Sequence, residues 1–353
     1  MKVAIINDTH AGIRNSSDIF INNSEKFYSD VFFPYLLDNN IRRIIHLGDV
    51  FDNRKFINFR SLNRYRKSFL TKLREYGMHM DVIPGNHDTF FKNTNELNAL
   101  KELLGHYMGE ITIHMDPTVL NLDGFNFALL PWITQDNHDR SMEFIQTCKA
   151  DWLGGHLELK GFEVMRGVRS PHGTDHRIFS RFEKVLSGHF HTGSEEENIK
   201  YLGTQMEFFW NDAHDEKGFH ILDTSTRELE KIVNPHTLFE RIVYDDDKVD
   251  YSMYDTSHLD NKFVKVVVIN KKDLFTFDRF CDRIQSQKIH DLSIAENFSE
   301  FLGENVDDES VSVEDTADML DTYVEAVDTE LDKDKLKVNM RNLLAEAQAL
   351  EVA

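Results

Sequence analysis

The chain has 353 residues and a formal net charge of −21, from 61 acidic and 40 basic side chains. Hydrophobic residues make up 41% and aromatic residues 11%, which excludes an intrinsically disordered chain. Two cysteines, Cys148 and Cys281, are too few for a disulfide scaffold or a thiolate zinc cluster, and they indicate a reducing compartment. No segment has the ~20 consecutive apolar residues of a membrane-spanning helix, and the first apolar run is too short for a secretory signal.

Apolar, β-rich runs at 3–7, 42–50 and 79–83 predict three buried strands. Between them, apolar residues at helical spacing predict helices over about 24–38 and over 61–76. This alternation of strands and helices is typical of an α/β sandwich.

Beyond these elements the sequence becomes rich in strands. A short helix is expected to end at Gly105. Strand-like segments then follow at 111–115, 118–122, 125–132, 149–157, 184–190, 199–204 and 217–223. Their density indicates a second sheet packed on the first.

The pattern changes near Pro235, and we divide the chain there. Residues 1–235 form the main domain, and 236–290 contain two strand-like runs and a helix at about 273–288, as in a small αβ unit. Residues 291–353 hold 18 acidic against four basic residues, a net charge of −14 that leaves −7 for the rest. Within this acidic part we expect a linker at 291–315 and helices at 316–331 and 336–352.

Five short polar segments each follow an apolar strand. They are Asp8-Thr9-His10, Gly48-Asp49, Gly85-Asn86-His87-Asp88, Gly155-His156 and Gly188-His189-Phe190-His191. An α/β architecture places its ligand sites at the carboxyl ends of its strands. Mixed imidazole and carboxylate ligands favour manganese, iron or zinc over magnesium or calcium, and a carboxylate can bridge two ions.

Each segment alone also has an ordinary explanation. Asp-x-His occurs by chance, Gly-Asp is common in turns, and Gly85-Asn86-His87-Asp88 would suit an Asx turn with a solvated histidine. Gly188-His189-Phe190-His191 is more specific, because two histidines on one strand face are unusual outside metal sites. The ordered set therefore favours a metal site, with Gly155-His156 its weakest member.

In this order the five motifs resemble the calcineurin-type metallophosphoesterase superfamily. Within it, the chain is most similar to SbcD-type nuclease subunits of SbcCD-like complexes, especially the phage recombination endonuclease subunits. The specific motifs cover roughly residues 1–225. The resemblance implies a two-sheet metallophosphoesterase sandwich flanked by helices, with a small αβ capping domain at 236–290 and C-terminal helices.

The resemblance also implies a role for each motif residue. Asp8, His10 and His191 would bind one metal ion, Asn86, His156 and His189 would bind a second, and Asp49 would bridge them. His87 would act on the scissile phosphate or the leaving oxygen, with Asp88 orienting its ring. Asp52 and Glu158 stand where some relatives carry histidine, and their roles stay open.

The implied function is a DNA nuclease with two divalent ions, manganese being favoured. As an exonuclease and endonuclease subunit in DNA repair, recombination and replication, it would act with an SbcC-type ATPase docked on the C-terminal helices. A homodimer through 91–104 and a cytoplasmic location, in a host cell if the protein is phage-encoded, are also implied. The alternatives are a stand-alone metallophosphatase or phosphodiesterase, and an inert DNA-binding scaffold, which the complete ligand set disfavours.

A basic run follows the second strand. Eight basic residues and no acidic ones lie between Arg54 and Arg74. A solvated helix face is one explanation, and a track for the DNA backbone is the other. We favour the track, with Arg54, Lys55, Arg60, Arg64, Lys67 and Arg74 as candidate contacts.

Overall fold

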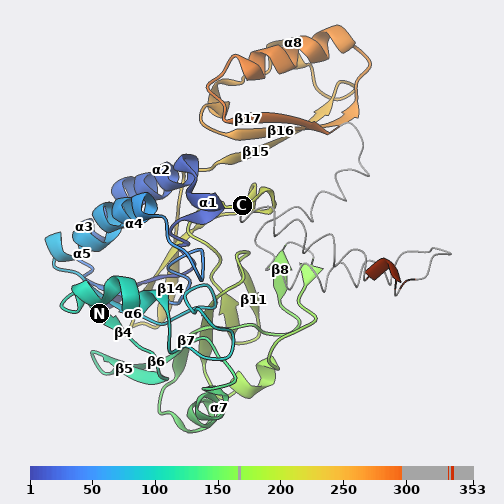
Figure 1. Cartoon of the computed structure of the whole chain (residues 1–353). Helices are drawn as coiled ribbons and strands as arrows, with labels where there is room; N and C mark the ends of the chain where they lie inside the picture. The colour runs from blue at the N-terminus through green and yellow to red at the C-terminus, as the bar shows by residue number, and fades with distance from the viewer. Residues whose placement is uncertain (166–167, 296–332, 334, 338–353) are drawn as a thin grey trace. The chain divides into compact units, whose positions relative to one another are not determined.

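The computed structural model describes residues 1–165, 168–295, 333 and 335–337 (Figure 1). The chain forms two units, Met1–Phe301 and Leu302–Ala353. In the first unit the helices are α1 (Ile13–Ser16), α2 (Asp18–Phe27), α3 (Phe33–Asp38), α4 (Phe59–Tyr65), α5 (Thr71–Glu75), α6 (Ala99–Leu104), α7 (His138–Thr147) and α8 (Leu274–Gln285). π-Helical turns, Tyr28–Phe32 and Arg66–Leu70, connect α2 to α3 and α4 to α5.

Two six-stranded sheets form most of this unit. The first has the order β14-β13-β1-β2-β3-β4, and the second β11-β12-β10-β7-β6-β5. The first sheet comprises β1 (Lys2–Ile6), β2 (Arg43–His46), β3 (His79–Val82), β4 (Ile111–Ile113), β13 (Gly218–Asp223) and β14 (Glu228–Val233). The second comprises β5 (Thr118–Leu122), β6 (Phe125–Leu130), β7 (Trp152–His156), β10 (Lys184–Gly188), β11 (Ser194–Glu196) and β12 (Ile199–Tyr201). A separate hairpin pairs β8 (Glu163–Met165) with β9 (Val168–Arg169).

The residues of β1 show how the sandwich is built. Val3 and Ile5 belong to the core between the sheets, together with Phe127, Leu186 and other residues of the second sheet. Ala4 and Ile6 face the opposite way, into the core beneath the helices. Because side chains alternate along a strand, one apolar segment serves both cores. The predicted two-sheet α/β sandwich is therefore confirmed.

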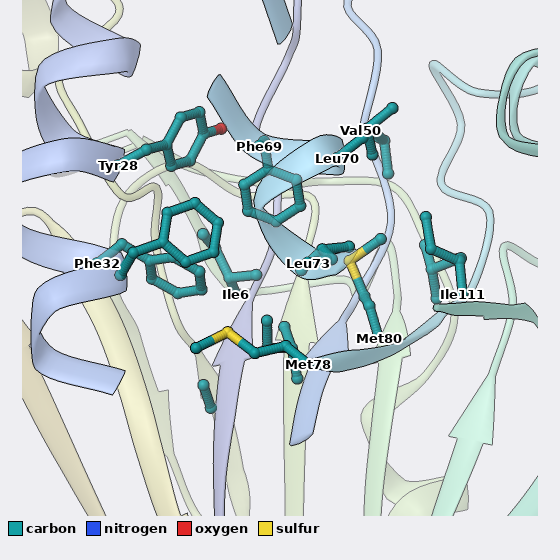
Figure 2. Close-up of a cluster of buried hydrophobic side chains, with 14 of the residues drawn as sticks. Ile6, Tyr28, Phe32, Val50, Phe69, Leu70, Leu73, Met78, Met80 and Ile111 are labelled. Carbon is teal, nitrogen blue, oxygen red and sulfur yellow. The ribbon is translucent and has the colours of Figure 1, made fainter. Parts of the chain in front are cut away.

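An aromatic core joins the first sheet to the helices α2–α5. Figure 2 shows Tyr28, Phe32 and Phe69 gathered around Ile6. The rings of Tyr28 and Phe69 have centroids 4.9 Å apart, and those of Tyr65 and Phe69 stack at 5.3 Å. The two predicted helices thus form as α2–α3 and α4–α5, whereas α7 and β14 were not predicted.

The small αβ unit has its own sheet. Strands β15 (Phe239–Asp245), β16 (Phe263–Asn270) and β17 (Asp291–Ala295) are parallel, and α8 covers one face (Figure 1). β17 corrects the predicted linker, because 291–295 pair with β16. The acidic composition of the whole segment concealed this short strand. Of the predicted C-terminal helices, only 336 and 337 lie within the described residues, and both are helical.

Phe69→Ala should lower the free energy of unfolding by about 3–5 kcal/mol, because it leaves a cavity in the aromatic core. Urea unfolding followed by far-UV circular dichroism would measure the change. The matched control is Phe275→Ala, since Phe275 is 70% exposed on α8, and its effect should stay within about 0.5 kcal/mol. Equal effects of the two substitutions would contradict this account of the core.

Candidate metal centre

The polar motif residues follow strands of both sheets and converge. Asp8 and His10 follow β1, Asp49 follows β2, Asn86 follows β3, and His156 ends β7. His189 and His191 follow β10. Asp8, His10, Asp49 and His189 have positive φ values of 48°, 43°, 55° and 87°. Such strain costs about 1–3 kcal/mol per residue and is typical of functional sites.

The first group consists of Asp8, His10 and His191. One ligand atom from each lies within 4.8 Å of the other two. The Nε2 atoms of His10 and His191 are 3.2 Å apart, and Asp8 Oδ1 is 3.8 Å from His10 Nε2. The structure therefore brings together all three predicted ligands of the first ion.

The second group combines Asp49, His156 and His189, again within 4.8 Å, with the amide of Asn86. Asn86 Oδ1 lies 3.0 Å from both His156 Nε2 and His189 Nδ1. Neighbouring ligands of an octahedral ion at about 2.1 Å are separated by about 3 Å. The observed spacing is that of ligands around one small cation.

The hydrogen bond at the far side of the His156 ring tests whether a cation fits. His156 Nδ1 donates to the carbonyl of Leu47 at 2.8 Å, so the neutral ring presents a lone pair at Nε2. That lone pair faces Asn86 Oδ1 and, at 3.3 Å, Asp49 Oδ2, which are also acceptors. Acceptors packed this closely repel one another unless a proton on Nε2 or a metal cation lies between them. The donor set fits a divalent metal ion.

Asp49 lies between the two groups. Its Oδ2 is 3.3 Å from His156 Nε2 and 3.8 Å from His10 Nε2, and its Oδ1 accepts the backbone N–H of His87 at 2.8 Å. A Cβ on Gly85 would lie 2.1 Å from Asp49 Oδ1, so only glycine fits there. This position is suited to a carboxylate that bridges two ions.

The electrostatics of the site agree with this geometry. Burial by itself lowers the pKa of His156 and is the largest single effect, but the charge and hydrogen bond of Asp49, the charge of Asp8 and the Leu47 carbonyl together outweigh it and raise that pKa to about 9. Burial likewise opposes protonation of His10, yet its interactions with Asp52 and Asp49 raise its pKa to about 9. The negative potential that stabilises an imidazolium here would also stabilise a bound cation.

The ring of His87 is held by Asp52, which corrects the predicted role of Asp88. His87 Nδ1 lies 2.5 Å from the Asp52 carbonyl oxygen and donates to it. Asp88 is fully buried and accepts the backbone N–H groups of Val50, Phe51 and Gly85 at 3.0, 3.1 and 2.9 Å. Asp88 thereby ties the loop after β2 to the loop after β3.

Asp52, whose role the sequence left open, also orients a predicted metal ligand. Its Oδ1 is 3.3 Å from His10 Nδ1, on the opposite side of the ring from Nε2. A carboxylate behind a ligating histidine sets the ring's tautomer and orientation. Glu158 does not join either ligand group and instead lines a neighbouring cavity.

The sequence analysis assigned no role to three residues that support the site. Asn7 donates to Asp8 Oδ2 at 2.6 Å and to the Gly203 carbonyl at 2.9 Å. Buried Lys217 donates to the carbonyl of His191 at 2.9 Å. Trp132 packs against His189, with centroids 5.2 Å apart. A polar or aromatic residue directly after an apolar strand is the signal that would have found Asn7 and Trp132.

Within the described residues, several of the basic side chains between Arg54 and Arg74 have acidic partners and others have none. Arg60 pairs with Asp18, Arg64 with Asp18 and Glu25, and Arg74 with Glu110. For these three arginines, the structure therefore favours the first explanation, a solvated helix face with ion pairs, over a track for the DNA backbone. Lys55 and Lys67 are exposed and have no ion pair within the described residues. Arg54 is half-buried in the loop after Asp52.

Residues 1–193 match the family model "Calcineurin-like phosphoesterase". The chain is 31% identical to exonuclease subunit 1 of Enterobacteria phage T4 over 337 residues, covering 95% of each chain. Among solved structures, it is similar to an archaeal phosphodiesterase, with 19% identity, a TM-score of 0.35 and coverage of 66% of this chain and 100% of that one. It is also similar to the protein TT1561 of Thermus thermophilus, with 11% identity, a TM-score of 0.38 and coverage of 66% and 98%.

Among the described residues, no helix is long and apolar enough to cross a membrane. The family match spans all five motifs, and both groups of candidate ligands lie within it. The predicted resemblance is therefore confirmed. The chain belongs to the calcineurin-like phosphoesterase family, whose members hydrolyse phosphoester bonds with the aid of two metal ions.

Proposed function

We propose that the protein is the nuclease subunit of an SbcCD-like complex, hydrolysing DNA phosphodiesters as an exonuclease and endonuclease in repair, recombination and replication. One observation carries the proposal. A complete set of two-metal ligands lies beside His87 in a chain that is 31% identical, over 95% of its length, to an exonuclease subunit. We propose manganese for both ions, because mixed imidazole and carboxylate shells favour transition metals.

In this mechanism Asp8, His10 and His191 would hold one ion, Asn86, His156 and His189 would hold the other, and Asp49 would contribute to both. Two such ions would supply Lewis-acid activation of the phosphodiester and of the attacking water.

The chain's own residues orient the reacting groups. The Leu47 carbonyl and the Asp52 carboxylate fix the rings of His156 and His10. The Asp52 carbonyl occupies His87 Nδ1–H, so His87 Nε2 is the atom left to give a proton to the leaving oxygen.

The second candidate is a stand-alone metallophosphatase or phosphodiesterase. The same metal ligands would serve it, so the distinction rests on the rest of the chain. The similarity to the phage exonuclease subunit extends over 337 residues, well beyond the family match at 1–193. This extent favours the nuclease subunit. The ratio of activity on DNA ends to activity on p-nitrophenyl phosphate separates the two candidates.

The assembly is also part of the proposal. Exposed Phe91 and Leu97, at 48% and 40%, support a homodimer surface within 91–104. The sheet of β15–β17 with α8 supports a small capping domain that selects DNA ends. Residues 316–353 would dock on an SbcC-type ATPase in the cytoplasm of the cell, or of the host if a phage encodes the protein.

Asp49→Ala should abolish manganese binding and DNA cleavage together, because it removes the carboxylate between the ligand groups. His87→Ser should retain manganese and lose cleavage, since His87 belongs to neither of the two ligand groups proposed to hold the ions and lies with His10 and Asp52 beside the first of them. Metal analysis after gel filtration, paired with digestion of linear duplex DNA, measures both effects. If His87→Ser lacked manganese while Asp49→Ala retained it, the proposed roles of Asp49 as a metal ligand and of His87 as a catalytic group would be wrong.

Replacing Lys55 and Lys67 by glutamine should flatten the dependence of log Kd for DNA on log salt concentration. The expected change in slope is about 1 for each lost phosphate contact. Fluorescence anisotropy with labelled duplex at several salt concentrations measures it. The matched control is Arg74→Gln, because Glu110 already neutralises Arg74. A larger change in slope for Arg74→Gln than for the lysine variant would contradict this prediction and would indicate that the ion-paired arginines contact the DNA backbone.

Deleting residues 305–353 should abolish co-purification with the ATPase subunit and spare manganese-dependent DNA cleavage. The reason is that both ligand groups lie in Met1–Phe301, which forms a unit of its own. Pull-down with the tagged ATPase and a nuclease assay of the same preparation give the two readouts. Retained co-purification would refute the docking role of the C-terminal segment.

A further inference from the structure

The two imidazoles of the second ligand group are oriented by different kinds of contact. Nδ1 of His156 donates to the Leu47 carbonyl at 2.8 Å, on the far side of the ring from Asn86. The ring of His189 makes a single hydrogen bond within the described residues, between its Nδ1 and Asn86 Oδ1 at 3.0 Å. A hydrogen bond at the far nitrogen is what usually orients a metal-binding histidine. For His189, the contacts that remain to orient the ring are packing contacts.

The backbone of His189 is fixed, so its side-chain torsions are what packing must set. Its N–H donates to Asp8 Oδ2 at 3.0 Å. Besides the ring of His156, two rings lie against the imidazole, Phe190 with centroids 4.9 Å apart and Trp132 at 5.2 Å. Phe190 is the next residue and belongs to a core of the second sheet, whereas Trp132 comes from the segment after β6. Trp132 also lies 5.8 Å from the His156 ring, so it contacts both imidazoles of the group.

Three hydrogen bonds hold the backbone of Trp132. Its carbonyl accepts Asn95 Nδ2 at 2.8 Å and Asn137 Nδ2 at 3.0 Å, and its N–H donates to the Pro84 carbonyl at 3.0 Å. Both asparagines are buried. Pro84 lies between β3 and Asn86, so Trp132 is tied directly to the loop that supplies another ligand of the same group.

Asn95 is itself held in a closed loop, residues 89–98. Thr89 and Asn98 pair at the base of this loop, and Asn98 Nδ2 donates to the Asn95 carbonyl at 2.8 Å. The loop begins shortly after Asn86 in the chain. Both the Pro84 contact and the Asn95 contact therefore fix Trp132 relative to the segment around Asn86.

We infer that Trp132 is a positioning residue, which Asn95 and Asn137 hold in place and which sets the orientation of the His189 ring toward the second ion. The inference rests on the ligand assignment of the proposed function. The second side-chain torsion of histidine has no sharp intrinsic preference, so neighbouring groups decide it. A ring that is already oriented loses less conformational entropy when it binds a cation, which raises the affinity of the site. The first ligand group packs against a different ring, that of Phe208, and should not depend on Trp132.

Binding of Mn²⁺ to the metal-free protein tests the inference without relying on catalysis. Titration calorimetry of the wild type should show two bound ions, and Asn86→Ala identifies the second ion as the one whose binding it removes. Trp132→Leu should weaken that ion by about 10–100-fold, the range usual for residues that orient metal ligands, without weakening the other. Trp132→Phe should recover most of the loss, because it restores an aromatic ring.

A second variant loosens Trp132 without removing its ring. Replacing Asn95 and Asn137 together by alanine should weaken the same ion and spare the other. The matched control is Asn198→Ala, because Asn198 also donates through Nδ2 to two backbone carbonyls, of Phe179 and Phe182 at 3.0 and 2.8 Å, and lies outside both ligand groups. It should lower the thermal stability and leave the affinity for both ions as in the wild type.

The inference would be overturned if Trp132→Leu and the double asparagine variant bound both ions as tightly as the wild type. An equal loss of affinity in Asn198→Ala would also overturn it, since the effect would then be one of general stability. Duplex DNA digestion by the same preparations keeps the proposed function separate. A wild type that binds two ions and cleaves no DNA would overturn the nuclease function, while the role of Trp132 would stand on the binding data.

Discussion

Two carboxylates buried among histidines are the constraint on which the rest of the molecule depends. Asp8 and Asp49 have almost no exposed surface, and an uncompensated buried charge costs several kcal/mol per ion. Protons on His10 and His156 provide one compensation, and divalent cations provide a stronger one. Since these groups must come together for the chain to fold, cation binding and folding stability are coupled at this centre.

Both sheets are needed to satisfy that constraint. The first sheet supplies the carboxylates after β1 and β2, and the second supplies imidazoles at β7 and β10. The core between the sheets, which includes Val3, Ile45 and Leu186, holds these strand ends in fixed positions. Close approach then demands glycine, as at Gly48, where a Cβ would lie 2.6 Å from His156 Nδ1.

The convergence of the candidate ligands could be predicted from sequence because each of them lies at or after the end of an apolar strand, and strand ends meet at one edge of a sheet; which of them would share an ion came from the family resemblance. The orientation of the rings could not be predicted. It depends on carbonyls distant in the chain, such as Leu47 for His156, 109 residues away, and Asp52 for His87, 35 residues away.

Partners distant in the chain also decide the ion pairs of the basic run and the end of the small αβ unit, so local sequence could not predict them. Composition identifies the basic run, but the acidic partners of Arg64 and Arg74 lie 39 and 36 residues away along the chain. Pairing of β17 with β16 likewise decides that 291–295 form a strand within an acidic segment. Local patterns therefore predicted which polar residues come together at the strand ends, while tertiary contacts decide which charged side chains form ion pairs.

The boundary that we place at residue 235 separates two sequence patterns, but side chains on its two sides pack against each other. Phe208 contacts the rings of His10 and His191, with centroids 5.6 and 5.7 Å away. The preceding residue, Glu207, accepts the N–H groups of Leu238 and Phe239 at the start of β15. Phe208, Leu238 and Phe239 also share one apolar cluster. Because packed interiors transmit strain, the start of the small sheet is mechanically connected to two of the candidate metal ligands, His10 and His191.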